Sequence, residues 1–459
     1  HNKMKGIIVC ILLCSVAISL SEANKTIWSA SDLVNWFKNN PEPKSDDVLE
    51  IGSDLIFDKV TLKYPLGVVN GVCTPFTGMI KGNGKTIKGL TMDNKKDTVY
   101  SSAGLFCGLN GARIENLKID ASCAFTGVSV GALTVMVTGG TSVHLSLIEN
   151  KAKINGEHDV SGLIGSVNSK VSGTVSLSDC KNFGVVTATG KNSGGLIGHV
   201  VQSRAAQIII EKSENQGFIT GVENVGGLVG CVSNTEEVQI IINQCKNNNK
   251  VGGRNYIGGF IGNVENNVWS LQPPESVIII NSVNKAIVTG ESTVCGFFCS
   301  SNPISSPSIP LVKVENSINH GEVTGQSAFG IGEVVVTASN VINFGKVSGS
   351  ITAEALWSIA IGCESVFCLD TTFNGCDGAS KITKGADGFY YVTGTKMLVS
   401  EMLNWNIAFN QKWRTLTFWK GNLEFQQKEG KLSLANSIAI SFTPLFFVFF
   451  MIIQSLFSF

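Results

Sequence analysis

Proline is scarce in this chain, with 10 among 459 residues, whereas glycine is abundant, with 50. This balance suits tight turns between regular strands and argues against a disordered linker protein. Charge is also sparse: Asp, Glu, Lys and Arg make up 15% of the residues, and the two signs balance at 35 each. Because no basic block occurs, we expect neither nucleic acid nor an anionic lipid surface among its partners.

The chain also has few groups for metal binding or catalysis. None of its five histidines has metal-ligand spacing to a cysteine or another histidine. His199 lies at a variable repeat position, which we interpret as a tolerant surface or corner site. The other copies have at this position Ser166, Cys231 and Asn263. Because Asp120, Asp159 and Asp179 fall at different repeat positions, we predict no catalytic carboxylate pair. We expect no catalytic residue, no metal site and no cofactor.

What the chain does contain is a Gly-apolar-apolar-Gly block that recurs at nearly constant spacing. Its copies start at Gly162, Gly195, Gly227, Gly259, Gly296 and Gly330, which are 33, 32, 32, 37 and 34 residues apart. A fixed period of this size is typical of a solenoid, in which each repeat buries the apolar face of its neighbour.

Each repeat holds three short apolar segments and no helical periodicity. In the unit 195–226 these segments are 196–200, 207–211 and 218–221, and residues 224–226 lead into the next copy. Three short strands per coil of about 33 residues predict an all-β protein, a parallel β-helix of triangular section. Parallel crossovers are almost always right-handed, so we expect that hand.

An asparagine precedes each glycine block by 11 to 13 residues. The copies are Asn150, Asn182, Asn215, Asn247, Asn284 and Asn319, and one more stands at Asn343. We expect them at a corner of the coil, because asparagine tolerates left-handed backbone. Their amides would bond from coil to coil as a ladder. A row of sugar-binding amides on the surface is the alternative.

Composition divides the chain into six parts. These are a leader at 4–23, an N-terminal cap at 24–60, atypical first coils at 61–127, regular repeats at 128–350, a C-terminal cap at 351–432 and a tail at 433–459. In the N-terminal cap we expect a short amphipathic helix over 29–37, since open solenoids need a lid over the last exposed strand edges.

Both ends suggest export to a cell surface. The leader has the form of a secretory signal peptide cleaved after Ala23. Asn24 then starts an N-K-T sequon, which is either glycosylated or an unmodified turn. From 442 to 459 the chain is nearly all apolar, and no basic residue follows. We expect a glycosylphosphatidylinositol (GPI) attachment signal with Ser433 as the attachment residue; a membrane-spanning tail is the alternative.

The chain has 13 cysteines, two of them in the leader. The remaining 11 are too sparse for a disulfide scaffold, and their odd number leaves at least one thiol unpaired within the chain. We expect a local pair in the C-terminal cap, formed by Cys363 or Cys368 with Cys376. Cys180 and Cys245 share a repeat position but lie two coils apart, too far for a bond.

The Gly-Leu-Ile-Gly and Gly-Leu-Val-Gly blocks resemble the GLUG-motif repeat of exported surface and adhesin-like proteins. Segments at 54–58, 65–67, 76–78, 82–90 and 104–106 resemble the entry segment of that family, so the resemblance covers roughly 28–350. The pattern departs at Cys299, where glycine is expected, and at 330–332, which is one residue short. The family implies a β-helical surface protein without catalytic residues, and the anchor signal points to a eukaryotic microbe such as a protist.

These features predict a secreted, membrane-anchored protein on the extracellular face of the plasma membrane. Its expected role is adhesion, display or coat structure, without catalysis. Its expected partners are the membrane, through the C-terminal anchor, and glycans or proteins of a host or extracellular matrix. The alternative is a β-helical lyase or hydrolase that acts on extracellular glycans.

Overall fold

The computed structural model describes residues 24–168, 170–201, 207–233, 239–265, 275–301, 311–332, 336–343, 345–354, 364–369, 380–384, 390–392, 416–419 and 422–425. Ala23, Ser433, Cys363 and Cys376 lie outside this part of the chain, as do the leader and the tail. Contacts divide the chain into two units, His1–Ile382 and Thr383–Phe459.

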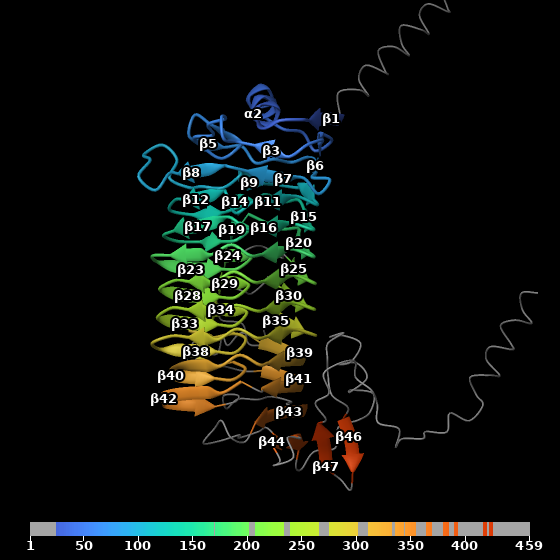
Figure 1. Ribbon diagram of the computed structural model, residues 1–459, viewed down its shortest axis with the longest axis vertical. Helices are drawn as coiled ribbons and strands as arrows, with labels where there is room; N and C mark the ends of the chain where they lie inside the picture. The colour runs from blue at the N-terminus through green and yellow to red at the C-terminus, as the bar shows by residue number, and fades with distance from the viewer. Residues whose placement is uncertain are drawn as a thin grey trace, which may run out of the picture. The chain divides into compact units, whose positions relative to one another are not determined.

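The first unit is a stack of coils joined by parallel strand pairing, which confirms the predicted β-helix (Figure 1). In one step of the stack, Ile208 lies opposite Val175 of the coil before and Ile240 of the coil after. The repeat spacing therefore becomes strand register: equivalent residues of successive repeats lie side by side.

Each coil passes through three sheets. The first sheet (sheet 1) contains β1 (Asn24–Ile27), β2 (Val48–Ile51), β3 (Leu55–Ile56), β6 (Met79–Lys81), β7 (Thr86–Lys88), β10 (Arg113–Glu115), β11 (Lys118–Ile119), β15 (Val143–Ser146), β16 (Glu149–Asn150), β20 (Thr174–Ser178), β21 (Lys181–Asn182), β25 (Gln207–Glu211), β26 (Glu214–Asn215), β30 (Gln239–Asn243), β31 (Lys246–Asn247), β35 (Glu275–Ile280), β36 (Val283–Asn284), β39 (Leu311–Asn319), β41 (Val336–Asn343), β43 (Glu364–Leu369) and β44 (Ser380–Lys384).

Sheet 2 contains β8 (Thr91–Asp93), β12 (Ala124–Thr126), β13 (Val130–Gly131), β17 (Lys153–Gly156), β18 (Val160–Ser161), β22 (Val186–Ala188), β23 (Lys191–Gly194), β27 (Ile219–Thr220), β28 (Glu223–Gly226), β32 (Val251–Gly252), β33 (Asn255–Gly258), β37 (Val288–Thr289), β38 (Thr293–Cys295), β40 (Val323–Phe329) and β42 (Val347–Glu354). Sheet 3 contains β9 (Phe106–Leu109), β14 (Thr134–Val137), β19 (Ile164–Val167), β24 (Ile197–Val200), β29 (Val229–Ser233) and β34 (Ile261–Glu265).

In two of the three sheets, a bend divides the segment that a coil contributes into two short strands. In sheet 1, Lys212 adopts a φ of 49° between β25 and β26. In sheet 2, residues 223–226 form the strand β28, whereas the sequence suggested only a connection to the next copy. The three faces per coil are as predicted, but the regular coil 197–226 carries five short strands.

A single column of apolar side chains fills the stack. Inward positions alternate along the strands, so that Ile208 and Ile210 are fully buried while Ile209 between them is half-buried and faces outward. The same buried cluster continues from Ile27 to Val347. Because each coil supplies only part of this core, the coils depend on one another for stability.

The N-terminal end is covered by α2 (Ala30–Asn39). Its N-cap is Ser29, whose Oγ accepts the backbone N–H of Asp32 at 3.2 Å. Leu33 and Phe37 of the helix are buried against the first coils. Nearby, β4 (Val68–Val69) and β5 (Val72–Cys73) form an antiparallel hairpin.

Two disulfides occur in the described residues, and neither was foreseen from the sequence. Cys73 is bonded to Cys107, 34 residues later, and Cys295 is bonded to Cys299. The predicted pair in the C-terminal cap falls on residues of which only Cys368, in β43, is described. The described cysteines that stay free are all buried: Cys123, Cys180, Cys231 and Cys245.

The described residues of the second unit form short antiparallel strands. β47 (Asn422–Phe425) pairs with β45 (Tyr390–Val392) and with β46 (Leu416–Trp419). This differs from the uniformly parallel stacking of the coils.

Candidate functional site

The recurring asparagines form a ladder inside the stack. Side-chain amides of successive coils bond to one another at 2.6 to 3.2 Å, from Asn150 through to Asn343. All of them are fully buried: Asn150, Asn182, Asn215, Asn247, Asn284, Asn319 and Asn343. A buried amide cannot reach a sugar outside, so this row serves the fold and is no binding site.

Six of the seven amides in the ladder, all but that of Asn247, also bond to the backbone two residues on and so hold their own turn. Asn215 Nδ2 donates to Asn247 Oδ1 and to the Gly217 carbonyl, both at 2.9 Å. Its Oδ1 accepts from Asn182 Nδ2 at 2.9 Å and from the Gly217 N–H at 3.2 Å. All four hydrogen-bonding positions of the side chain are therefore filled, as burial requires.

The backbone explanation for these asparagines was wrong. They lie in strands, and their φ angles are not positive. Left-handed residues of the sheet 1 corner stand three positions before six of them: Leu147, Asp179, Lys212, Gln244, Asn281 and Asn316. The left-handed position accepts Leu147 and Lys212, so the corner itself does not require one residue type. Asparagine is required at the ladder position because of its amide.

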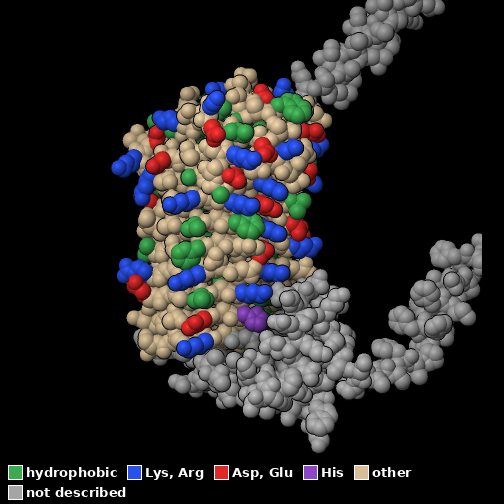
Figure 2. Space-filling model, in the orientation of Figure 1, with side chains coloured by type: hydrophobic (Ala, Val, Ile, Leu, Met, Phe, Trp, Pro, Cys, Tyr) green, Lys and Arg blue, Asp and Glu red, His purple; other side chains and the backbone are tan. Residues whose placement is uncertain are grey.

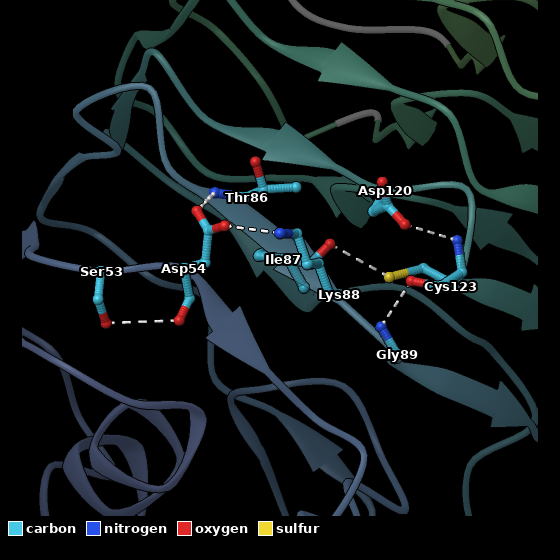
Figure 3. A network of polar contacts seen from close by, with 9 residues as sticks. Ser53, Asp54, Thr86, Ile87, Lys88, Gly89, Asp120 and Cys123 are labelled. Carbon is cyan, nitrogen blue, oxygen red and sulfur yellow. Dashed lines mark hydrogen bonds and ion pairs between the residues drawn. The ribbon is translucent and has the colours of Figure 1, made fainter.

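Acidic side chains in the first coils are engaged in structural contacts (Figure 3). Asp54 binds Lys88 Nζ at 2.7 Å and accepts the Thr86 N–H at 2.9 Å. The bond from Lys88, followed by that from Thr86, lowers the pKa of Asp54. Asp120 accepts the N–H of Ser122 at 3.0 Å, which lowers its pKa. Both carboxylates hold turns and strands in place.

A cleft of about 470 Å³ lies at the N-terminal cap, between α2 and residues 61–70. Its lining includes the apolar Phe37 and the cation Lys63. Lys63 Nζ binds Asp97 at 3.3 Å. Backbone bonds, the largest from Tyr100, lower the pKa of Asp97 to about 2, so this carboxylate stays charged beside Lys63. Of the two lysines in the lining, Lys38 and Lys63, the second is thus already paired within the chain.

Sheets 2 and 3 bring three chemically active side chains together. His199 Nδ1 lies 3.1 Å from Asp159 Oδ1, and His199 Nε2 lies 2.7 Å from Ser233 Oγ. Asp159 precedes β18, His199 belongs to β24 and Ser233 ends β29, so each comes from a different coil. The interpretation of His199 as a tolerant corner position missed these contacts, because Asp159 occupies another phase of the repeat.

A second amide ladder supports this group. Asn192 Nδ2 donates to Asp159 Oδ1 at 2.9 Å, Asn224 donates to Asn192 at 2.9 Å, and Asn263 donates to Asn224 at 3.0 Å. The three asparagines are buried, with 1 to 3% of their surface exposed. The carboxylate of Asp159 is therefore the end of a fixed row of amides.

The outer face of sheet 1 carries an isoleucine stripe, formed by Ile209, Ile241 and Ile278. Strand register places these three side by side in successive coils. The neighbouring coils carry polar residues at the same outward position, Ser176 on one side and Lys313 on the other. The runs 208–210 and 240–242 are all isoleucine, and because strand residues alternate in direction, the middle isoleucine must face outward. That signal was present in the sequence but was not used.

Charged side chains do not gather by sign on the face shown in Figure 2, where acidic and basic groups are interspersed. Within the described part of the chain, no three His, Cys, Asp or Glu side chains are grouped so as to hold a metal ion. In that same part, no helix has both the length and the apolarity needed to cross a bilayer.

Comparison with known proteins places the chain in no family. No family model matches it, and no curated protein matches it. Among solved structures, the chain is similar to a candidate immunoglobulin A1 protease from Bacteroides ovatus. The two share 15% sequence identity, with 88% of this chain and 93% of that chain covered and a TM-score of 0.41.

Proposed function

We propose that this chain is a secreted cell-surface protein for adhesion or display, which binds a protein partner through the isoleucine stripe of sheet 1. The observation that carries the proposal is the outward column Ile209, Ile241 and Ile278, in which each isoleucine is half-buried and which Ser176 and Lys313 bound on its two sides. Apolar side chains that face outward in a row are typical of surfaces that bind another macromolecule.

The surroundings of the stripe favour a protein partner over a glycan. Gln207 Nε2 donates to Gln239 Oε1 at 2.9 Å beside the stripe, and Glu211, Asn243 and the half-buried Ile280 flank its other side. An apolar centre with a polar rim is the usual arrangement of a protein interface. Sugars, which are rich in hydroxyl groups, would leave most of their hydrogen bonds unmade against isoleucine.

A glycan-active enzyme, the other function considered, would need a pair of carboxylates on either side of a glycosidic bond. Asp54, Asp97 and Asp120 instead bind Lys88, Lys63 and Ser122 within the chain. We therefore favour binding over glycan cleavage.

Replacing Ile241 with Lys will weaken adhesion. The purified protein is tested on plates coated with collagen, laminin or fibronectin, and on a glycan array in parallel. We expect Ile241→Lys to lower binding to a matrix protein about tenfold or more, because a charge enters the centre of the apolar contact.

Ser176→Lys is the matched control, since Ser176 occupies the same outward column two coils away and lies outside the stripe. It should bind as the unmodified protein does, and both variants should unfold at the same urea concentration. Equal losses of binding in the two variants, or binding of the unmodified protein to the glycan array alone, would contradict the proposal.

Attachment to the membrane is proposed through a GPI anchor at Ser433, as the apolar tail suggests. Treating expressing cells with a phosphatidylinositol-specific phospholipase should release the protein into the medium, because the enzyme cuts the lipid from the anchor. Protein that stays on the treated cells, while a known GPI-anchored protein is released, would show that the tail spans the membrane instead.

A further inference from the structure

We infer that Asp159, His199 and Ser233 form an acyl-transfer site, in which Ser233 is the nucleophile that attacks small carboxylic esters. This activity goes beyond the proposed adhesion function and does not depend on it. The inference rests on the contacts of three side chains from three coils and on what holds them there.

The distances suit a nucleophile, a base and an orienting group. The 2.7 Å between His199 Nε2 and Ser233 Oγ, and the 3.1 Å between His199 Nδ1 and Asp159 Oδ1, are both within hydrogen-bonding reach. Because the carboxylate accepts the Nδ1–H proton, Nε2 is left free to accept the proton of Ser233. His199 and Ser233 belong to strands of a continuous sheet, which keeps the pair rigid.

Asp159 is held so that it can orient the imidazole. Burial alone would raise its pKa, but the bonds from His199 and Asn192 outweigh this effect and the pKa is lowered. The amide row that begins at Asn192 fixes the carboxylate in position. Gly198 permits the close approach of the two sheets, since a Cβ there would lie 2.7 Å from the Asp159 backbone.

The neighbouring thiol is a poor competitor for the role of nucleophile. Cys231 Sγ lies 3.6 Å from Ser233 Oγ, but the side chain is buried, and burial raises the pKa of the thiol well above its usual range. The thiolate is the reactive form of cysteine. Ser233 and His199 are half-buried, so a small ester can reach them from solvent.

The reaction has two balanced steps. Ser233 Oγ bonds to the ester carbonyl carbon while its proton passes to His199 Nε2, and the alcohol leaves with that proton. Water then attacks the acyl group, His199 takes a proton from it, and Ser233 recovers the proton as the carboxylic acid departs. We assign esters and not amides as substrates. At a half-exposed site, water weakens the electrostatic stabilisation of the negative charge that develops on the carbonyl oxygen, so the reaction needs the better leaving group, which is the alcohol of an ester.

A fluorophosphonate probe tests the assignment on the purified full-length protein. Ser233 Oγ should bond to phosphorus, with loss of fluoride and transfer of the proton to His199, and peptide mapping should find the adduct on Ser233. The protein should also hydrolyse p-nitrophenyl acetate. Ser233→Ala should abolish both signals, and His199→Gln should lower both about 100-fold or more.

Asp159→Asn separates an orienting role from a structural one. It keeps the shape of the side chain, so the urea midpoint should change little, while labelling should fall about 100-fold. Ser166→Ala, in the equivalent position to His199 one coil earlier, should leave labelling unchanged. An unlabelled Ser233 in the unmodified protein, or labelling that survives His199→Gln, would overturn the inference. Because Ser233→Ala leaves the isoleucine stripe intact, it should still bind matrix protein.

Discussion

Replacing Asn215 with Asp will destabilise the stack by about 4 kcal/mol at neutral pH, the cost expected when a buried network loses a donor and gains an uncompensated charge. The substitution keeps the shape of the side chain but exchanges its NH₂ group for a second oxygen. That oxygen would face Asn247 Oδ1 and the Gly217 carbonyl, both of which now accept hydrogen bonds from Asn215. The site has no exposed surface, so water cannot separate the facing oxygens.

The stability lost in the Asn215→Asp variant should depend on pH in a defined direction. Burial raises the pKa of the new carboxyl group in the folded state above its value in the unfolded chain. The stability of the variant is then highest below the unfolded pKa and falls as the pH rises through the folded pKa. Urea unfolding at acidic and neutral pH measures this difference against the unmodified protein.

Asn249→Asp is the matched control for this experiment. Asn249 is exposed in the following coil, and its Nδ2 donates to the Gln216 carbonyl at 2.7 Å. The change there should cost about 0.5 kcal/mol or less, as is usual for surface substitutions. If the two variants unfold alike, the ladder contributes no more than a surface contact does.

Replacing Gly227 with Ala will cost about 5 kcal/mol, because one methyl group would enter a space already occupied by backbone. A Cβ at Gly227 would lie 2.1 Å from the Gly259 carbonyl oxygen and 2.2 Å from Asn247 Nδ2. Asn247 belongs to the same repeat as Gly227 and Gly259 begins the next one, and Asn247 Nδ2 also donates to Gly259 O at 2.7 Å. Relief of the clash must therefore break the ladder or spread the coils.

Gly252→Ala provides the comparison. At Gly252, in β32 of the same repeat, the nearest atom to a Cβ would be Thr289 Oγ1 at 3.5 Å, an ordinary contact. We expect a change within about 1 kcal/mol, since alanine loses less chain entropy on folding than glycine. Urea midpoints and the rate of limited proteolysis measure both variants. Similar values for the two would show that the first glycine of the repeat block is not required for close packing.

The spacing between the asparagine and the glycine block now has a physical explanation. Gly195 approaches Asn215, Gly227 approaches Asn247, and Gly259 approaches Asn284. The 11 to 13 residues between asparagine and glycine are the length of chain that brings both to the same corner. The regularity of the motif was visible in the sequence, but its cause was not.

Two features could not be predicted from the repeat: one lies outside the regular array, and the other joins different phases of it. Cys73 and Cys107 are 34 residues apart, close to one period, yet they lie in the atypical coils where no repeat block marks the register. Asp159 and His199 occupy different repeat positions and meet only because sheets 2 and 3 lie close together at Gly198. A periodic sequence shows which residues are equivalent, whereas the contact between Asp159 and His199 joins residues that are not.

The sequence by itself determined that this protein is a parallel solenoid. A period near 33 residues, with glycine and asparagine at constant offsets, can be met only by stacking equivalent strands in register, because each coil must bury its apolar positions against the next. The tertiary structure alone decided which positions of the period face one another around a coil. Those contacts depend on how the chain bends between sheets, and that bending set Asp159 against His199.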